Sequence, residues 1–495
     1  MRIRTVKSKT GTISVQVVDY RDGERKFIKH IGSARGSEEI ETLKRVAQKW
    51  IADYLGQESL FSDDSSSNSK KFLLRNFKNL GVRYNFFAEE INKVFGHLGL
   101  DGVPSPLLLD LALVRIFEPT SKRQSQKLLE KCFGRSYQIT DLYKKLPGLT
   151  EFKDLVEEKL VSFAKAQLGF NFSFVLYDVT TLYFESFSPD DFRKTGFSKD
   201  NKANQPQIVI GLMVDNNGFP LSYSIFEGNK FEGKTFLPVI RAFQKKYAVK
   251  TLTVVADAAM ISWDNVQKLK EFGLSYIVGA RLGSLGQSLI TKVSQELNIQ
   301  DKANLRLETD KGFLICDFSQ KRYDKDKWEM EKQVDKATQV LNTGKALKRL
   351  KFLTAASKTE SVLNQNLIDK AKLQLGIKGY YTNLDLPNQT IVDRYHDLWK
   401  VEKSFRISKS DLLMRPIFHF KKQAIEAHIL ICVMALAVLK FVEMETNVSA
   451  RSLVGMLTEV TDTVIYHPKT GEEFFWRSEI PEGTIIWLSK LWRPH

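Results

Sequence analysis

The first 60 residues alternate apolar and polar positions and then change to a helical period. Alternation is typical of strands with one buried face, and it occurs in "TISVQVVDY" and "KFIKHIG", which Arg21-Asp22-Gly23 joins as a turn. An amphipathic helix is predicted over about 37–55. The polar, serine-rich residues 61–71 have no apolar period and are predicted to be a linker. We therefore expect a small α+β region over residues 1–60, followed by a linker.

Residues 72–168 have mostly helical periods. "SPLLLDLALVRIFEP" has the length of a helix that Pro119 stops, and Ser121 or Thr120 can cap the helix that follows. Two short helices rich in lysine and arginine then surround a tight turn at Gly134. This pattern suits a helix-turn-helix DNA reader and suits an ordinary helical bundle with a basic face equally well. We predict a mainly helical, candidate DNA-binding domain.

From residue 170 the chain changes to segments rich in β-branched and aromatic residues, which are typical of strands. Asn216-Asn217-Gly218 marks a hairpin turn. The predicted order is three antiparallel strands, a helix, a strand, a helix and a strand, which is an α/β fold. The strands are, in chain order, "NFSFVLYDVTTLYF", "PQIVIGLMVD", "FPLSYSIFEG", "LTVVADAAM" and "LSYIVGAR".

Residues 286–385 interrupt this order with lysine-rich, mixed signals and predict an inserted domain. Two long helical patterns return within residues 386–445. The eleven-residue apolar run 429–439 is too short to span a bilayer and predicts a buried helix. Residues 446–495 consist of short, mixed segments and are predicted to be a separate C-terminal region.

The composition favours a polyanionic partner. The 495 residues carry a formal net charge of +16, which points first to nucleic acid and second to an anionic membrane surface. The three cysteines lie far apart, and the N-terminus lacks the apolar core of a signal peptide. We therefore expect a cytoplasmic protein without disulfides.

One literal motif needs a separate interpretation. Gly228, Gly233, Lys234 and Thr235 match the phosphate-loop pattern G-x-x-x-x-G-K-[ST]. A working phosphate loop follows a central parallel strand, which is apolar throughout. Here the preceding strand is the second arm of a hairpin and alternates as "LSYSIF". The motif is therefore interpreted as a turn between a strand and a helix.

Two aspartates stand within apolar strands. Asp178 lies in "FVLYDVTTLYF" and Asp257 ends "LTVVAD". A carboxylate is costly to bury unless a cation meets it. One such residue is readily explained as a strand-end aspartate that bonds to a loop. Two in one α/β layer favour a shared divalent cation, which prefers oxygen ligands.

A third acid lies in the helical pattern "YHDLWKVEKSFRISK". Tyr395, Glu402 and Lys409 are seven residues apart, so that two helical turns separate each pair and the three form one stripe. Arg406 lies one turn beyond Glu402. Phenol, ammonium and guanidinium groups around a carboxylate suit a metal ligand beside a phosphate backbone. An amphipathic surface helix with an ordinary salt bridge is the alternative. The apolar neighbours predicted to pack inward are Leu398, Trp399 and Phe405.

Asp178, Asp257 and Glu402 occur where the DDE transposases of bacterial insertion sequences keep their catalytic triad. The third segment resembles the family signature Y-(2)-R-(3)-E-(6)-K, with Leu398 in the arginine position. Residues 170–445 look like the long-spacing branch of the insertion-sequence-four group. The stretches that carry this resemblance are "VLYDVTTLYFES", "FPLSYSIFEGNKFEGKT", "VVADAAM", "KGYYTNLD" and "VEKSFR".

The resemblance implies an α/β, RNase H-like catalytic core in two parts, residues 169–285 and 386–445, with 286–385 inserted between them and the helical region before them. It implies that the three acids hold two Mg²⁺ ions, for which Mn²⁺ substitutes. It further implies that transposon ends and target DNA are the partners, that strands are cleaved and transferred, and that a homodimer forms on DNA in a bacterial cytoplasm. The residues expected to contact DNA are Tyr395, Arg406 and Lys409.

Three other functions stay open at this level, of which a phosphate-loop NTPase is the outsider. A nuclease with the same core would cut DNA without joining it. A non-enzymatic DNA-binding derivative of a transposase would keep the basic surface and lose the metal.

Overall fold

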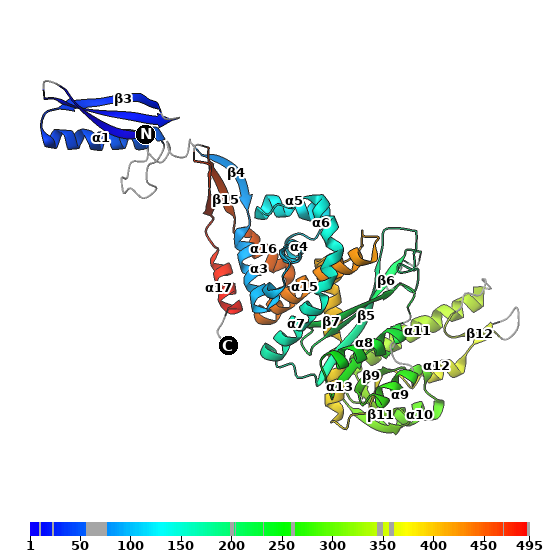
Figure 1. Ribbon diagram of the computed structural model, residues 1–495. Coiled ribbons are helices and arrows are strands. Elements are labelled where there is room, and N and C mark those ends of the chain that lie inside the picture. Colours follow the sequence, from blue (N-terminus) through cyan, green and yellow to red (C-terminus); the bar gives the residue numbers. More distant parts are fainter. Residues whose placement is uncertain are drawn as a thin grey trace. The chain divides into compact units, whose positions relative to one another are not determined.

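The computed structural model describes residues 1–8, 11–21, 24–55, 77–198, 202, 204–230, 232–258, 263–343, 350–355, 361–468 and 470–492. The chain forms two compact units, and Figure 1 labels the main helices and strands of both. One consists of Met1–Tyr84 and Val460–Glu479, and the other of Asn85–Glu459 and Ile480–His495. The predicted linker lies outside the described residues.

The first unit begins with a three-stranded antiparallel sheet. Its order is β1 (Arg2–Lys7), β2 (Ile13–Arg21), β3 (Glu24–Ala34), and α1 (Ser37–Leu55) follows. The predicted strand pair and helix agree with β2, β3 and α1. Strand β1 was not predicted, because its basic sequence shows little apolar alternation. Val15, Val17 and Ala47 form the centre of the core between sheet and helix.

A second small sheet in this unit joins distant parts of the chain. Its order is β16 (Glu472–Arg477), β15 (Asp462–His467), β4 (Lys78–Arg83). The prediction of a helical region over residues 72–168 is therefore corrected for residues 78–83, which form a strand, and within the described residues from 77 onward the first helix begins at Asn85. The partner of β4 lies at the other end of the chain, so that local sequence carries no signal for this pairing.

The second unit begins with helices, as predicted. Ser105 caps α4 by accepting a hydrogen bond from the Leu108 backbone N–H, and Ser121 caps α5 in the same way through Gln124. Gly134 ends α5 in the left-handed conformation. The elements are α3 (Asn85–His97), η1 (Leu100–Gly102), α4 (Pro106–Phe117), α5 (Lys122–Phe133), α6 (Ile139–Lys145), η2 (Leu146–Phe152) and α7 (Lys153–Gln167).

Helix α15 (Lys422–Thr446) is the core helix of this unit. It is long and apolar enough to cross a membrane, but 94% of its most apolar 18-residue window is buried inside the protein. The prediction of a buried helix at 429–439 is confirmed. Helices α3, α4, α7 and α17 (Glu482–Leu491) pack against it, and α16 (Ala450–Glu459) packs on α3.

A mixed eight-stranded sheet forms the rest of this unit. Its order is β10-β11-β14-β9-β8-β5-β6-β7. Strand β6 is antiparallel to β5 and β7, and β5, β8 and β9 are parallel. These five strands and their two helices follow the predicted order. They are β5 (Phe174–Tyr183), β6 (Gln207–Val214), β7 (Pro220–Glu227), α8 (Glu232–Lys246), β8 (Thr253–Ala256), α9 (Trp263–Glu271) and β9 (Ser275–Ala280).

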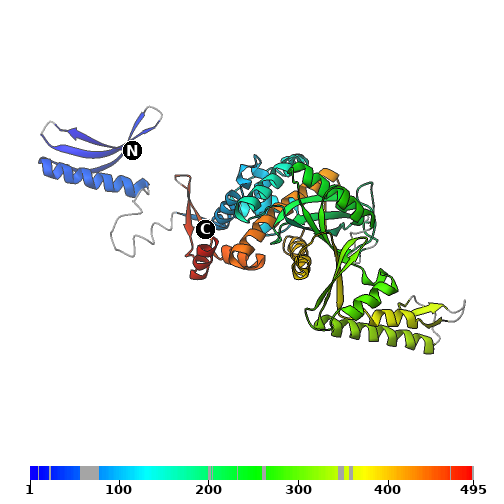
Figure 2. The same cartoon turned by 90° about the horizontal axis from the view of Figure 1, so that it is seen from below.

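The first and last parts of the segment predicted to be an inserted domain instead contribute strands to this sheet, all at the edge beyond β9. Strands β10 (Asn304–Thr309), β11 (Gly312–Phe318) and β14 (Ile377–Thr382) continue it antiparallel beyond β9. The middle of the segment has a core of its own, around Ala337, Phe352 and Ile368, and Figure 2 shows the long helix of this part in yellow-green. The remaining elements are η4 (Leu282–Ser284), α10 (Gln287–Glu296), α11 (Gln320–Thr343), β12 (Leu353–Ala355), β13 (Ser361–Leu363) and α12 (Gln365–Lys372).

The helix that carries the third acid is divided into three pieces. They are α13 (Asn388–His396), α14 (Trp399–Arg406) and a π-helical turn, η5 (Ile407–Asp411). A tight turn separates the first two, in which the Leu398 and Lys400 N–H groups each bond to the carbonyl three residues earlier. Despite both irregular turns, the three residues of the predicted stripe, Tyr395, Glu402 and Lys409, line the same cleft.

Candidate active site

The two aspartates are neighbours because of strand register. The parallel ladder of β5 and β8 ends with Tyr177 opposite Ala256, and Asp178 and Asp257 are the next residues on the two strands. Residues opposite one another on adjacent strands point to the same face, about 4.8 Å apart. The register therefore brings both carboxylates to one edge of the sheet.

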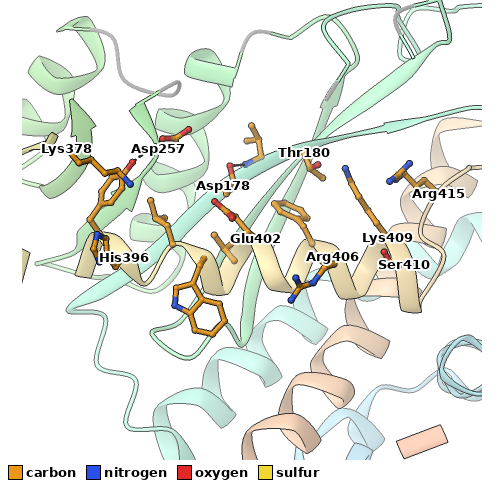
Figure 3. Close-up of a pocket in the computed structure, with 16 residues that line it drawn as sticks. Asp178, Thr180, Asp257, Lys378, His396, Glu402, Arg406, Lys409, Ser410 and Arg415 are labelled. Atoms are coloured by element: carbon orange, nitrogen blue, oxygen red, sulfur yellow. Dashed lines mark hydrogen bonds between the residues drawn. The ribbon is translucent and has the colours of Figure 1, made fainter. Parts of the chain in front are cut away.

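A cleft of about 880 Å³ opens at this edge. All six predicted site residues line it: Asp178, Asp257, Tyr395, Glu402, Arg406 and Lys409. In Figure 3 the carboxylates of Asp178 and Glu402 project into the same space, with Asp257 beside them. The structure thus brings together acids that are 79 and 145 residues apart in the chain.

Charge is ordered along the cleft. The three acids occupy its centre, Lys378 and His396 lie at one end, and Arg406, Lys409 and Arg415 lie at the other (Figure 3). A chain of phosphates suits such a surface, since basic groups hold the backbone on both sides of a central anionic site.

Tyr395 connects the acids to one of these basic ends. Its hydroxyl donates a hydrogen bond to Asp257 Oδ1 at 3.1 Å. Burial raises the pKa of Tyr395, and the negative charge of Asp257 and this hydrogen bond raise it further. The phenol therefore stays protonated and remains a donor. A Cβ at Gly279 would lie 2.5 Å from the Tyr395 hydroxyl oxygen. The phenol can therefore occupy this position only because residue 279 of β9 has no side chain.

Lys378 approaches the same phenol from strand β14. Its Nζ lies 4.5 Å from the centre of the Tyr395 ring, which is a cation–π contact. Burial and Arg322 lower the pKa of Lys378, while the charges of Asp317, Asp257 and Glu402 act in the opposite direction. No local pattern pointed to Lys378, because β14 pairs with β9 only after the long segment that follows β9.

Helix α14 is anchored at three points, and these set the position of Glu402. Lys400 Nζ donates to the Asn216 carbonyl at 2.7 Å, and Ser404 Oγ donates to the Gly218 carbonyl at 2.8 Å. Both acceptors belong to the hairpin turn between β6 and β7. On the other side, Lys403 forms an ion pair of 2.5 Å with Glu443 of the core helix α15. Glu402 itself is exposed to the cleft.

One predicted packing role is wrong. Leu398 and Phe405 are buried, as expected, but Trp399 is 53% exposed. Trp399 is the first residue of α14, after the tight turn, and lines the cleft rather than the core. The overwound turn rotates this position away from the face that a continuous helix would have given it. The other polar cleft residues that the sequence did not single out are Thr180, Lys378, His396, Ser410 and Arg415.

The donor set of the cleft suits hard divalent cations. Its acids offer only carboxylate oxygens, which Mg²⁺ prefers. Within the part of the chain that the structure describes, no three His, Cys, Asp or Glu side chains are grouped closely enough to hold one ion together.

The phosphate-loop pattern has a structural explanation. Strand β7 is antiparallel to β6 and lies at the edge of the sheet. Thr235 is fully buried, and its hydroxyl accepts a hydrogen bond from Tyr177. The Gly233 carbonyl accepts one from Asn265 Nδ2 at 2.7 Å. The start of α8 is thus tied into the core, and the strand before the motif is an antiparallel edge strand rather than a central parallel one, as the sequence interpretation predicted.

Replacing Lys234 by alanine should leave both nucleotide binding and DNA cleavage unchanged within about twofold. Lys234 is an exposed residue of α8, and exposed positions away from special contacts tolerate substitution. Fluorescent ATP titration and the cleavage assay described below check this. Saturable ATP binding by the wild type that Lys234→Ala abolishes would restore the nucleotide site.

Comparison with known proteins identifies the family. Residues 170–438 match the family model described as a transposase DDE domain. Because the match spans more than half of the chain, the protein belongs to this family, and the resemblance found in the sequence is confirmed at that level. The insertion-sequence-four group stays a prediction. No curated protein matches the chain.

One similar solved structure is described as a piggyBac transposase synaptic complex with hairpin DNA. The identity is 11%, the TM-score is 0.38, and the match covers 83% of this chain and 75% of that chain.

Proposed function

We propose that this transposase cleaves DNA at the ends of a mobile element and joins the released 3′ ends to target DNA. The observation that carries the proposal is the cleft in which three carboxylates stand between Lys378 at one end and Arg406, Lys409 and Arg415 at the other. The strand order around β5 supports an RNase H-like core, with the first acid on its first strand, the second just after its fourth and the third on a later helix.

Asp178 would bridge two Mg²⁺ ions, and Asp257 and Glu402 would each complete one of the two sites. When bound, such ions activate an attacking water or 3′-hydroxyl and stabilise the leaving oxygen. The protein's own part is to position the strand. Tyr395 orients Asp257 through its hydrogen bond. Arg406 and Lys409 would hold phosphates on one side of the scissile bond.

Lys378 would replace the cation that this chain lacks at the arginine position of the signature. Leu398 stands where the signature has arginine, and it is buried. Lys378 lies in the same cleft on another element, at the end opposite to Lys409 (Figure 3). It would therefore supply the second phosphate contact from a strand instead of from the helix.

Lys378→Ala should lower the rate of strand cleavage about tenfold to a hundredfold, because one preorganised cation near the developing charge is lost. Lys378→Arg retains the charge and should recover most of the rate. Lys370→Ala, on α12, is the matched control and should change the rate less than twofold. Equal cleavage rates for Lys378→Ala and wild type would contradict the proposed phosphate contact of Lys378.

The assay for the proposed function uses the DNA that flanks the gene. Purified protein is incubated with a labelled fragment of each flank, a target plasmid and Mg²⁺ or Mn²⁺. Joined product that needs the divalent ion supports the transposase reaction. Nicking without joining would favour the nuclease reading. Binding without any cleavage would indicate a non-enzymatic derivative.

A further inference from the structure

The N-terminal sheet has two unlike faces. Ile3, Val15 and Val17 pack toward α1, which lies along one face of the sheet (Figures 1 and 2). Successive residues of a strand point to opposite faces, so that Arg2, Arg4 and neighbours on β2 point the other way. Within the described residues up to 55, no helix covers that second face, which we call the open face.

Strand register arranges the open face in rows. Arg4 is opposite Gln16, and Gln16 is opposite His30, so that one row crosses all three strands. The adjacent row on one side contains Ser14 opposite Ser33, whose hydroxyls lie 2.7 Å apart. The row on the other side runs from Arg2 through Val18 to Phe27, which is 57% exposed.

The rows described here carry cations and hydrogen-bonding groups but no carboxylate. The acids in the first turns of α1, Glu38, Glu39 and Glu41, belong to the helix on the covered side. Asp19 forms an ion pair of 3.4 Å with the N-terminal amino group. The open face therefore combines positive charge with side chains that can recognise specific donor and acceptor patterns.

We propose that the open face binds the major groove of duplex DNA and reads the sequence at the element's ends. The inference rests on the proposed function and names the part of the chain that recognises its substrate. Arginine pairs with the guanine edge and glutamine with the adenine edge, both through two hydrogen bonds, and apolar groups contact the thymine methyl. Strands that enter a groove are an established mode of such reading. Arg2, Arg4, Gln16 and Phe27 provide these chemistries on one surface.

The test measures the ratio of affinities of the full-length protein for a flank fragment and for a scrambled duplex of equal composition, at several salt concentrations. Arg2→Gln/Arg4→Gln should lower this ratio at least tenfold. Lys44→Gln/Arg45→Gln removes the same charge from α1, on the covered side, and should leave the ratio unchanged. Gln16→Ala should lower the ratio without changing the salt dependence, since it removes a base contact and no charge.

Further variants distinguish a failure of this inference from a failure of the proposed function. Lys127→Gln/Lys131→Gln changes helix α5, the rival reader predicted as part of a helix-turn-helix. The inference would be overturned if Lys127→Gln/Lys131→Gln lowered the affinity ratio and Arg2→Gln/Arg4→Gln did not. It would also be overturned if the wild type bound neither flank fragment more tightly than the scrambled duplex. Circular dichroism checks that each variant is folded. Specific binding without cleavage or joining would instead contradict the proposed function and leave this inference standing.

Discussion

Asp178→Asn should abolish strand cleavage, with a loss of at least about a thousandfold, which corresponds to about 4 kcal/mol of transition-state stabilisation. Asp178 is next to Asp257 by strand register and faces Glu402 across the cleft. It is the carboxylate assigned to both ions, and an amide of the same shape removes the negative charge from both sites. DNA affinity should stay within about twofold, because no cation is lost.

The control for this change is Asp264→Asn. Asp264 is an exposed aspartate of α9 that pairs only locally with Lys268, four residues on, and exposed pairs of this kind contribute at most about 1 kcal/mol to stability. Single-turnover cleavage of a labelled flank, with binding followed by anisotropy, checks both variants. Cleavage by Asp178→Asn at more than about a tenth of the wild-type rate would contradict the assignment.

Glu443→Ala should destabilise the second unit by about 3 kcal/mol and lower activity as well. Glu443 of α15 accepts hydrogen bonds from Lys440, whose side chain is only 4% exposed, and from Lys403, the neighbour of Glu402. Removing one partner leaves a buried charge unpaired, which costs about 3–5 kcal/mol. The same change frees the end of α14 that positions Glu402.

The pH dependence of this contact has a definite sign. Burial favours the neutral acid, but the hydrogen bonds from Lys403 and Lys440 and their charges outweigh it and lower the pKa of Glu443. A lowered folded-state pKa contributes stability that is present above the unfolded value of about 4.3 and is lost as the pH falls through the folded value. The difference in stability between wild type and Glu443→Ala should therefore shrink below about pH 4.

Chemical denaturation at pH 7 and pH 3.5 measures both effects. Glu426→Ala on the same helix is the matched control, because half-buried Glu426 forms a longer ion pair, of 3.9 Å, with the exposed Lys422. Such a pair contributes at most about 1 kcal/mol. Equal midpoints for Glu443→Ala and Glu426→Ala would show that the Lys403 and Lys440 contacts do not hold the two helices together.

The central strands and the three acids could be predicted from local patterns in the sequence. Asp178 and Asp257 stand out as carboxylates in apolar strands, and the spacing of Tyr395, Glu402 and Lys409 survives a helix that is broken twice. These signals are local, because strand alternation and helical period depend on neighbouring residues only.

Long-range pairing explains most of what the sequence missed. Strand β4 pairs with β15 at the other end of the chain, and β14 returns to β9 after about a hundred residues. Lys378 reaches the cleft through this second pairing, so that its spacing from the acids has no period to detect. Trp399 was misplaced for a different reason, since the tight turn before α14 depends on tertiary packing rather than on helix propensity.

The most direct test of the account is a Mn²⁺ titration of the full-length protein bound to a flank fragment, with free Mn²⁺ followed by electron paramagnetic resonance. We expect two ions per chain in the wild type and in Asp264→Asn. Asp178→Asn should lose both, and Glu402→Gln should lose one. Unchanged Mn²⁺ binding by Asp178→Asn would show that the carboxylates of this cleft do not form the proposed divalent-ion site.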